Sequence, residues 1–133
     1  MLKKINNIAV KHNLYLFLSI IFAISIFLGS ITPKVSLGSI KNSGFFAHFT
    51  YYFILSSIVL LYLLGRKFQK PFIKAILLTG SYGILIEFIQ FSIFYRNFQI
   101  LDIITNFSGA FLILILLLLN KKLKNFRIKK TSR

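Results

Sequence analysis

Four long apolar runs alternate with short polar segments along the chain. The runs cover residues 14–31, 45–64, 72–94 and 100–119. Each is close to the roughly 20 residues that a helix needs to cross about 30 Å of hydrocarbon. A helix satisfies its own backbone hydrogen bonds in lipid, whereas a strand with open edges does not. The pattern therefore predicts an all-α membrane protein with four transmembrane helices.

The segments between the runs contain 13, 7 and 5 residues, which leaves no room for a soluble domain. Short connections make successive helices antiparallel neighbours, so we expect one membrane domain over residues 1–133, built as a four-helix bundle. Pro71 precedes the third run at a position where a helix does not need its missing N–H. The first run follows Lys3, Lys4 and Lys11, as in a signal peptide. It exceeds the usual 7–15 residues and no small-residue cleavage site follows, so we expect it to be retained.

Composition agrees with a membrane protein. Hydrophobic residues make up 56% of the chain, with 16 phenylalanines, and the mean hydropathy is +0.78. A soluble domain of this size could not hide that much apolar surface, because small domains bury only about 60–70% of what the unfolded chain exposes. Cysteine is absent from the sequence, which excludes disulfides and thiolate metal sites.

The 17 basic residues lie outside the apolar runs, apart from Lys74, and are spread along the chain rather than gathered on one polar face, which argues against nucleic-acid binding. Fourteen of them fall on one side of the predicted bundle: in the N-terminal segment, around the second connection and in a basic tail over residues 120–133. The other three are Lys34, Lys41 and Arg96. Because cytoplasmic segments are rich in Lys and Arg, we expect both termini in the cytoplasm. The tail also attracts anionic lipid.

Polar residues interrupt the last three runs near the predicted outer face. They are His48 and Tyr52 in the second run, Glu87 and Gln90 in the third, Asp102 and Asn106 in the fourth, and Arg96 in the turn between the last two. Within each run the two residues are three or four positions apart and so share a helix face. A carboxylate inside hydrocarbon costs at least ~2.5–3.5 kcal/mol and usually faces a protein partner. We therefore expect a polar cluster between the three helices.

A structural role for this cluster stays open. Arg96 would neutralise one carboxylate, His48 and Asn106 would satisfy the hydrogen bonds, and no ligand would be needed. Individual residues near helix ends could also simply reach the interface. Gly83 and Gly109 are expected to pack helices closely, since small residues let backbones approach in membranes.

The polar positions also have a fixed spacing. His48 and Tyr52 form H-x3-Y, and the run from Gly83 to Gly109 reads G-x3-E-x2-Q-x5-R-x5-D-x3-N-x2-G. This pattern resembles the VanZ-like family over residues 43–119. The first predicted helix is similar only in being an apolar run and carries no residue of the pattern. The resemblance implies a four-helix bacterial membrane protein associated with low-level teicoplanin resistance. Family members often carry Asp-Lys before the histidine, where this chain has Gly44 and Phe45, so we expect no metal and no cofactor.

The favoured function is a non-enzymatic protein of the bacterial cytoplasmic membrane. Its outer-face pocket would bind a lipid headgroup, a lipid-linked cell-wall precursor or the glycopeptide itself, with Arg96 holding an anionic group. One alternative is an intramembrane enzyme that uses His48, Glu87 and Asp102 as acid–base groups on a lipid-linked substrate. Another is a proton-coupled transporter, although such sites usually lie at the midplane. Homo-oligomerisation stays open.

Overall fold

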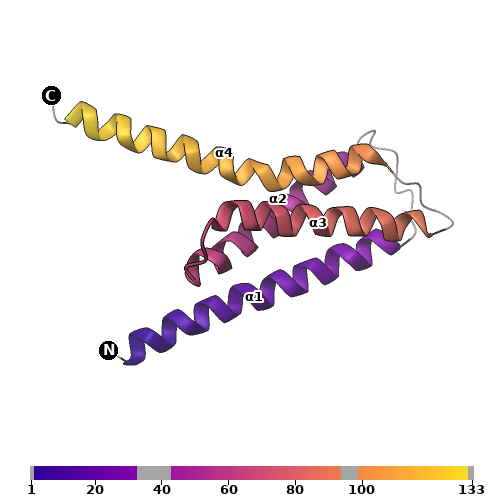
Figure 1. The fold of residues 1–133 in the computed structure, drawn as a ribbon, viewed down its shortest axis with the longest axis horizontal. Coiled ribbons are helices and arrows are strands. Elements are labelled where there is room, and N and C mark those ends of the chain that lie inside the picture. The colour runs from indigo at the N-terminus through magenta and orange to yellow at the C-terminus, as the bar shows by residue number, and fades with distance from the viewer. Residues whose placement is uncertain (1, 33–42, 94–98, 132–133) are drawn as a thin grey trace.

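The chain folds into helices throughout the part that its structure, a computed structural model, describes: residues 2–32, 43–93 and 99–131. These residues form α1 (Leu2–Ile31), α2 (Ser43–Gly65), α3 (Pro71–Phe91) and α4 (Ile100–Thr131) (Figure 1). They contain no strand. The all-α class predicted from the apolar runs is confirmed.

Three helices are long and apolar enough to span a membrane. The segments His12–Ile31, Gly44–Gly65 and Pro71–Phe91 have 20, 22 and 21 residues and mean hydropathies of 2.4, 1.7 and 1.7. The described apolar part of α4, Ile100–Leu116, is shorter. Large apolar side chains point outward from all four helices, and Leu101 on α4 is 70% exposed. So much outward apolar surface is suited to lipid rather than to water.

Two helices extend well beyond the apolar runs that predicted them. The helix α1 begins at Leu2 instead of near residue 14, and α4 continues to Thr131 through the basic segment expected as a tail. Neither extension contains Gly or Pro, and adding residues to an existing helix is far easier than starting one. Hydropathy marks the part of a helix that suits lipid, not the point where the helix ends.

The connection between α2 and α3 is a compact, basic turn. The N–H of Phe68 donates to the Leu63 carbonyl at 3.0 Å, and that of Lys67 donates to Leu64 at 3.1 Å. Together with the left-handed backbone of Lys67 (φ 55°), these bonds form a Schellman motif that closes α2. The new helix starts at Pro71, as the sequence predicted.

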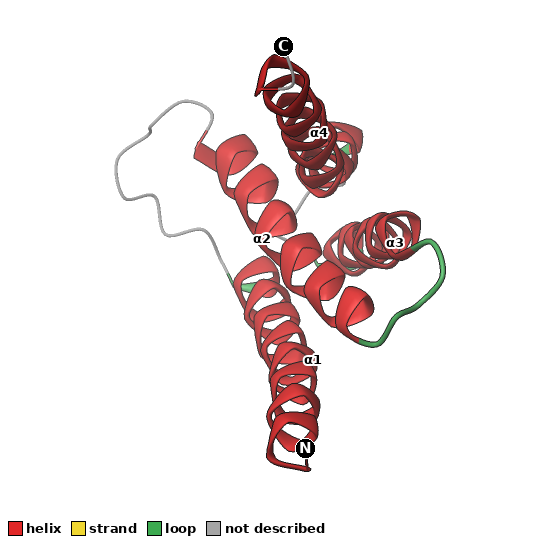
Figure 2. Cartoon of the chain, turned by 90° about the vertical axis from the view of Figure 1, so that its left-hand side faces the viewer, coloured by secondary structure: helices red, strands yellow, loops and turns green. Residues whose placement is uncertain are grey.

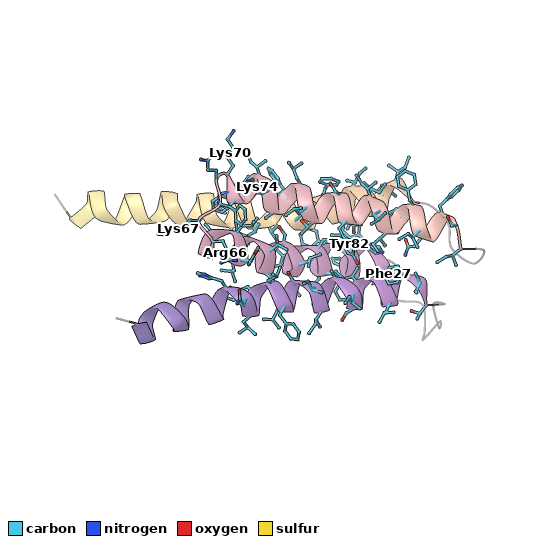
Figure 3. The ribbon with its side chains drawn as sticks, turned by 60° about the horizontal axis from the view of Figure 1, so that its bottom comes forward. Phe27, Arg66, Lys67, Lys70, Lys74 and Tyr82 are labelled. Atoms are coloured by element: carbon cyan, nitrogen blue, oxygen red, sulfur yellow. The ribbon has the colours of Figure 1, made fainter. Side chains whose placement is uncertain are left out.

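Basic side chains gather at this turn. Figure 3 shows Arg66, Lys67, Lys70 and Lys74 around it, with Tyr82 farther along α3. The Lys74 ammonium lies 5.0 Å from the centre of the Phe68 ring, a cation–π contact. This end of the molecule is therefore strongly positive.

The helix α2 contacts each of the other three and forms the centre of the structure (Figure 2). Near the basic turn the contacts are apolar, with Leu60, Leu63 and Ala75 buried together. Farther along, hydrogen bonds join the helices: Ser56 donates to the Ala110 carbonyl at 3.3 Å. The half of the molecule away from the basic turn is where polar groups are buried.

Candidate functional site

A polar cluster lies where the first turns of α2 and α4 meet the last turns of α3. The His48 ring on α2 links to two residues of α4. Its Nδ1 is 3.0 Å from Asn106 Oδ1, and its Nε2 is 3.7 Å from Asp102 Oδ2. Asp102 and Asn106 are one helical turn apart, so both can face the same imidazole.

The third helix supplies Glu87, which is 0% exposed. One of its carboxylate oxygens, Oε2, accepts a long hydrogen bond from the Gln99 N–H at 3.5 Å. Ligand atoms of His48, Glu87 and Asp102 all lie within 4.8 Å of one another. Residues from three separate helices thus form one compact group of titratable side chains.

Tyr52 on α2 and Asn106 on α4 are the remaining members of the cluster. Both are buried, Tyr52 at 1% exposure. Within the described residues, the Tyr52 hydroxyl and Asn106 Nδ2 have no hydrogen-bond partner. An unsatisfied buried polar group costs about 1–3 kcal/mol. We refer to His48, Tyr52, Glu87, Asp102 and Asn106 as the polar cluster.

Gln90 and Arg96 were also expected in this group. The Gln90 amide turns toward α1 and donates to the Ser30 carbonyl at 3.1 Å. Arg96, expected to hold an anionic group, lies outside the described residues. The polar cluster is therefore built from α2, α3 and α4, while Gln90 joins α3 to α1.

The structure places Gly83 and Gly109 at helix–helix contacts. A Cβ added at Gly83 would lie 3.0 Å from Asn106 Nδ2 and 3.1 Å from Tyr52 Cε1. One at Gly109 would overlap the backbone carbonyl oxygen of Phe49. These glycines therefore bring α3 and α2 close to α4 around the cluster.

A cavity of about 290 Å³ adjoins the cluster between α1, α2 and α3. Much of its wall is apolar, with Phe22 and Ile26 on α1 and Ile86 on α3. His48 and Gln90 provide polar groups on the same wall. His48 thus belongs to both the cluster and the cavity.

The part that α1 plays in this cavity was missed in the sequence. Ser25, Gly29 and Ser30 all line it, and a Cβ added at Gly29 would meet nothing within 4 Å. The available signal was the four-residue spacing of Ser25 and Gly29, which puts small residues on one helix face. Tyr82 of α3 also donates to the Ala23 carbonyl of α1 at 2.6 Å.

Two further close contacts involve glycines that the sequence did not single out. A Cβ at Gly80 would overlap the Phe107 ring on α4, and one at Gly65 would overlap the His12 ring on α1. Small residues inside apolar runs were again the available signal.

Comparisons of the chain with protein-family models, with curated proteins and with solved structures found no match. The arguments for function therefore come from the residues and their geometry.

Proposed function

We propose that this chain is a multi-pass protein of the bacterial cytoplasmic membrane that binds a lipid or lipid-linked molecule from the outer leaflet without transforming it. In this proposal all four helices span the bilayer as antiparallel neighbours, and both termini are cytoplasmic. Basic residues support this orientation, because Lys and Arg mark cytoplasmic segments. Glu87 lies 16 residues after Pro71, about 24 Å along the helix, so a cytoplasmic α2–α3 turn implies an outer position for the polar cluster.

The cavity beside the polar cluster is the observation that carries the proposal. Its volume is about 290 Å³, many times the ~10–15 Å³ that a single water needs. That is enough for a headgroup or a length of chain. Ligand sites commonly combine an apolar lining with a few polar groups that fix orientation. Here Phe22 and Ile26 suit a hydrocarbon chain, and His48 and Gln90 suit a polar head.

The polar spacing that resembles the VanZ-like family bears on the identity of the ligand. That resemblance supports a lipid-linked cell-wall precursor, or the lipid-tailed glycopeptide teicoplanin, as the bound molecule. In either case Arg96, which follows α3 in the sequence, would hold an anionic group with its forked donors. A link to glycopeptide resistance is part of the same proposal.

An intramembrane enzyme is the second candidate, favoured by the approach of three titratable groups. Ligand atoms of His48, Glu87 and Asp102 lie within 4.8 Å of one another, and these residues could act as acid, base and orienting group on a lipid-linked substrate. Turnover of a purified cell-wall lipid by the purified protein, lost in Glu87→Gln, would favour this candidate over binding alone.

Native mass spectrometry of the protein extracted with its own membrane lipids tests the binding proposal. We expect the wild-type protein to retain one lipid species. Gly29→Leu should lose it, because the new side chain fills the cavity from a position where a Cβ meets no neighbour. Ser81→Leu, the same kind of enlargement at an exposed position of α3, is the matched control. A wild-type protein that retains no lipid, or equal retention in both variants, would refute cavity binding.

A further inference from the structure

The donor atoms of the polar cluster lie close to the spacing that a bound metal ion requires. Two ligands about 2.1 Å from one ion lie roughly 3.0–4.2 Å apart, depending on the angle between the two bonds. The His48 Nε2 to Asp102 Oδ2 distance of 3.7 Å falls in this range. The third donor comes from Glu87, and the three atoms span no more than 4.8 Å. Small side-chain rotations would bring all three to one ion.

The contact of the His48 ring with Asn106 uses Nδ1, so Nε2 is the nitrogen that faces Asp102. With Asn106 Oδ1 as the acceptor, Nδ1 of a neutral imidazole carries the proton. The lone pair of Nε2 then points at Asp102 Oδ2, another acceptor. Two acceptors facing each other need a proton or a cation between them. A second-sphere hydrogen bond of this kind is the usual support of a metal-binding histidine.

The burial of Glu87 also suits a metal ligand. Its side chain is 0% exposed, and its carboxylate lies within 4.8 Å of the donor atoms of His48 and Asp102. Buried charged groups in proteins are paired or coordinate a metal.

Tyr52, one helical turn after His48 on α2, adds a further buried polar group. Its hydroxyl has no hydrogen-bond partner among the described residues. Helical tyrosines extend toward the N-terminus of their own helix, which directs this hydroxyl to the level of His48. It can therefore donate to a metal-bound carboxylate or to a water on the ion.

We propose that His48, Glu87 and Asp102 bind one divalent cation of the Mn²⁺ or Zn²⁺ type, with Asn106 orienting the imidazole. An imidazole ligand favours these ions over Mg²⁺ and Ca²⁺, which prefer oxygen alone. The sequence argued against a metal because Gly44 and Phe45 replace the expected acidic neighbour of His48. In the folded chain the ligands come from three helices, so an acidic residue next to His48 is not needed. This site goes beyond lipid binding and does not depend on it.

The composition of the chain makes the test specific. Asp and Glu total two, both in the cluster, the histidines are His12 and His48, and there is no cysteine. The full chain, purified in detergent without a histidine tag and stripped with EDTA, is titrated with MnCl₂ while the free Mn²⁺ signal is followed by electron paramagnetic resonance. ZnCl₂ is then added as a competitor. We expect one Mn²⁺ per chain, displaced by Zn²⁺.

Variants separate this site from adventitious binding. Asp102→Asn and His48→Asn remove a ligand with little change of shape and should abolish the stoichiometric binding. Asn106→Ala should weaken it about 10- to 100-fold, the usual effect of losing a second-sphere partner. His12→Asn is the matched control, because His12 packs against Gly65 far from the cluster, and its affinity should equal that of the wild type.

Three results would overturn the proposal. The first is wild-type protein that binds Mn²⁺ and Zn²⁺ no better than His48→Asn does. The second is Asp102→Asn protein that keeps full affinity, and the third is equal loss in His12→Asn. Size-exclusion profiles and circular dichroism establish that each variant is folded. If one variant does not fold, wild-type protein that binds no Mn²⁺ stoichiometrically still refutes the site. Because the titration uses the ion alone, its outcome is independent of lipid retention.

Discussion

The close contact between α2 and α4 gives a quantitative prediction for Gly109→Ala. The new Cβ would overlap the Phe49 carbonyl oxygen, and this obstacle is backbone rather than the end of a flexible side chain. The two helices must therefore move apart around a contact that also includes the Ser56–Ala110 hydrogen bond. Overpacking typically costs 1–3 kcal/mol, and an obstacle of fixed backbone places this case near 3 kcal/mol.

Gly29→Ala is the matched control for this change. Both glycines are helical, so both substitutions gain the helix propensity of alanine, up to about 1 kcal/mol. At Gly29 the added Cβ meets nothing within 4 Å, and only the gain remains. Allowing for the same gain at Gly109, its net loss is about 2 kcal/mol. We therefore expect the free energy of unfolding in detergent, followed by circular dichroism during SDS titration, to differ by about 3 kcal/mol between the variants. Equal stabilities would refute the close α2–α4 packing.

Three further predictions concern orientation, charge and the α1–α3 contact. Ser92→Cys should react with an impermeant thiol reagent in intact cells while Gln69→Cys is protected, and the reverse labelling would place the polar cluster on the cytoplasmic side. Glu87→Gln and Arg96→Gln should each lower the free energy of unfolding, because removing one charge leaves its partner buried and unpaired. The double variant should lose less than the sum of the two single losses, and additive losses would show that the two residues do not interact. Tyr82→Phe should lower the free energy of unfolding by about 1 kcal/mol through loss of its bond to the α1 backbone, and an unchanged value would make that bond incidental.

Hydropathy was enough to predict the helices but not their ends. In lipid the apolar run itself must be helical, so the spans near residues 45–64 and 72–94 agree with α2 and α3 to within three residues. The helical extensions of α1 to Leu2 and of α4 to Thr131 contain polar residues that fit a helix in water equally well. Nothing in a hydropathy pattern separates them from irregular tails.

Part of the polar cluster followed from spacing alone. His48 contacts both Asp102 and Asn106, because these two residues are four apart and share one face of α4. Gln90 does not point in the same direction as Glu87. The two residues are three positions apart on α3, which separates their side chains by about 60° around the helix axis. That rotation is enough to turn its amide toward Ser30 of α1. The spacing of residues within α3 does not predict which neighbouring helix packs against the face that carries Gln90.

The cavity was beyond sequence reasoning for a related reason. Phe22 and Ile26 look like any other apolar residues of a span, and a void depends on how three helices fit rather than on any one of them. The one sequence signal of the cavity was the pair of small residues Ser25 and Gly29, four positions apart on α1.

Photocrosslinking from the cavity tests the proposed lipid binding most directly. A photoreactive phenylalanine analogue is placed at Phe22, which lines the cavity, or at Phe17, which is 59% exposed on the same helix. After irradiation of intact cells and purification, mass spectrometry identifies the attached lipids. We predict one dominant lipid or lipid-linked species at Phe22 and a mixture matching the bulk membrane at Phe17. The same bulk mixture at both positions would contradict a specific ligand in the cavity.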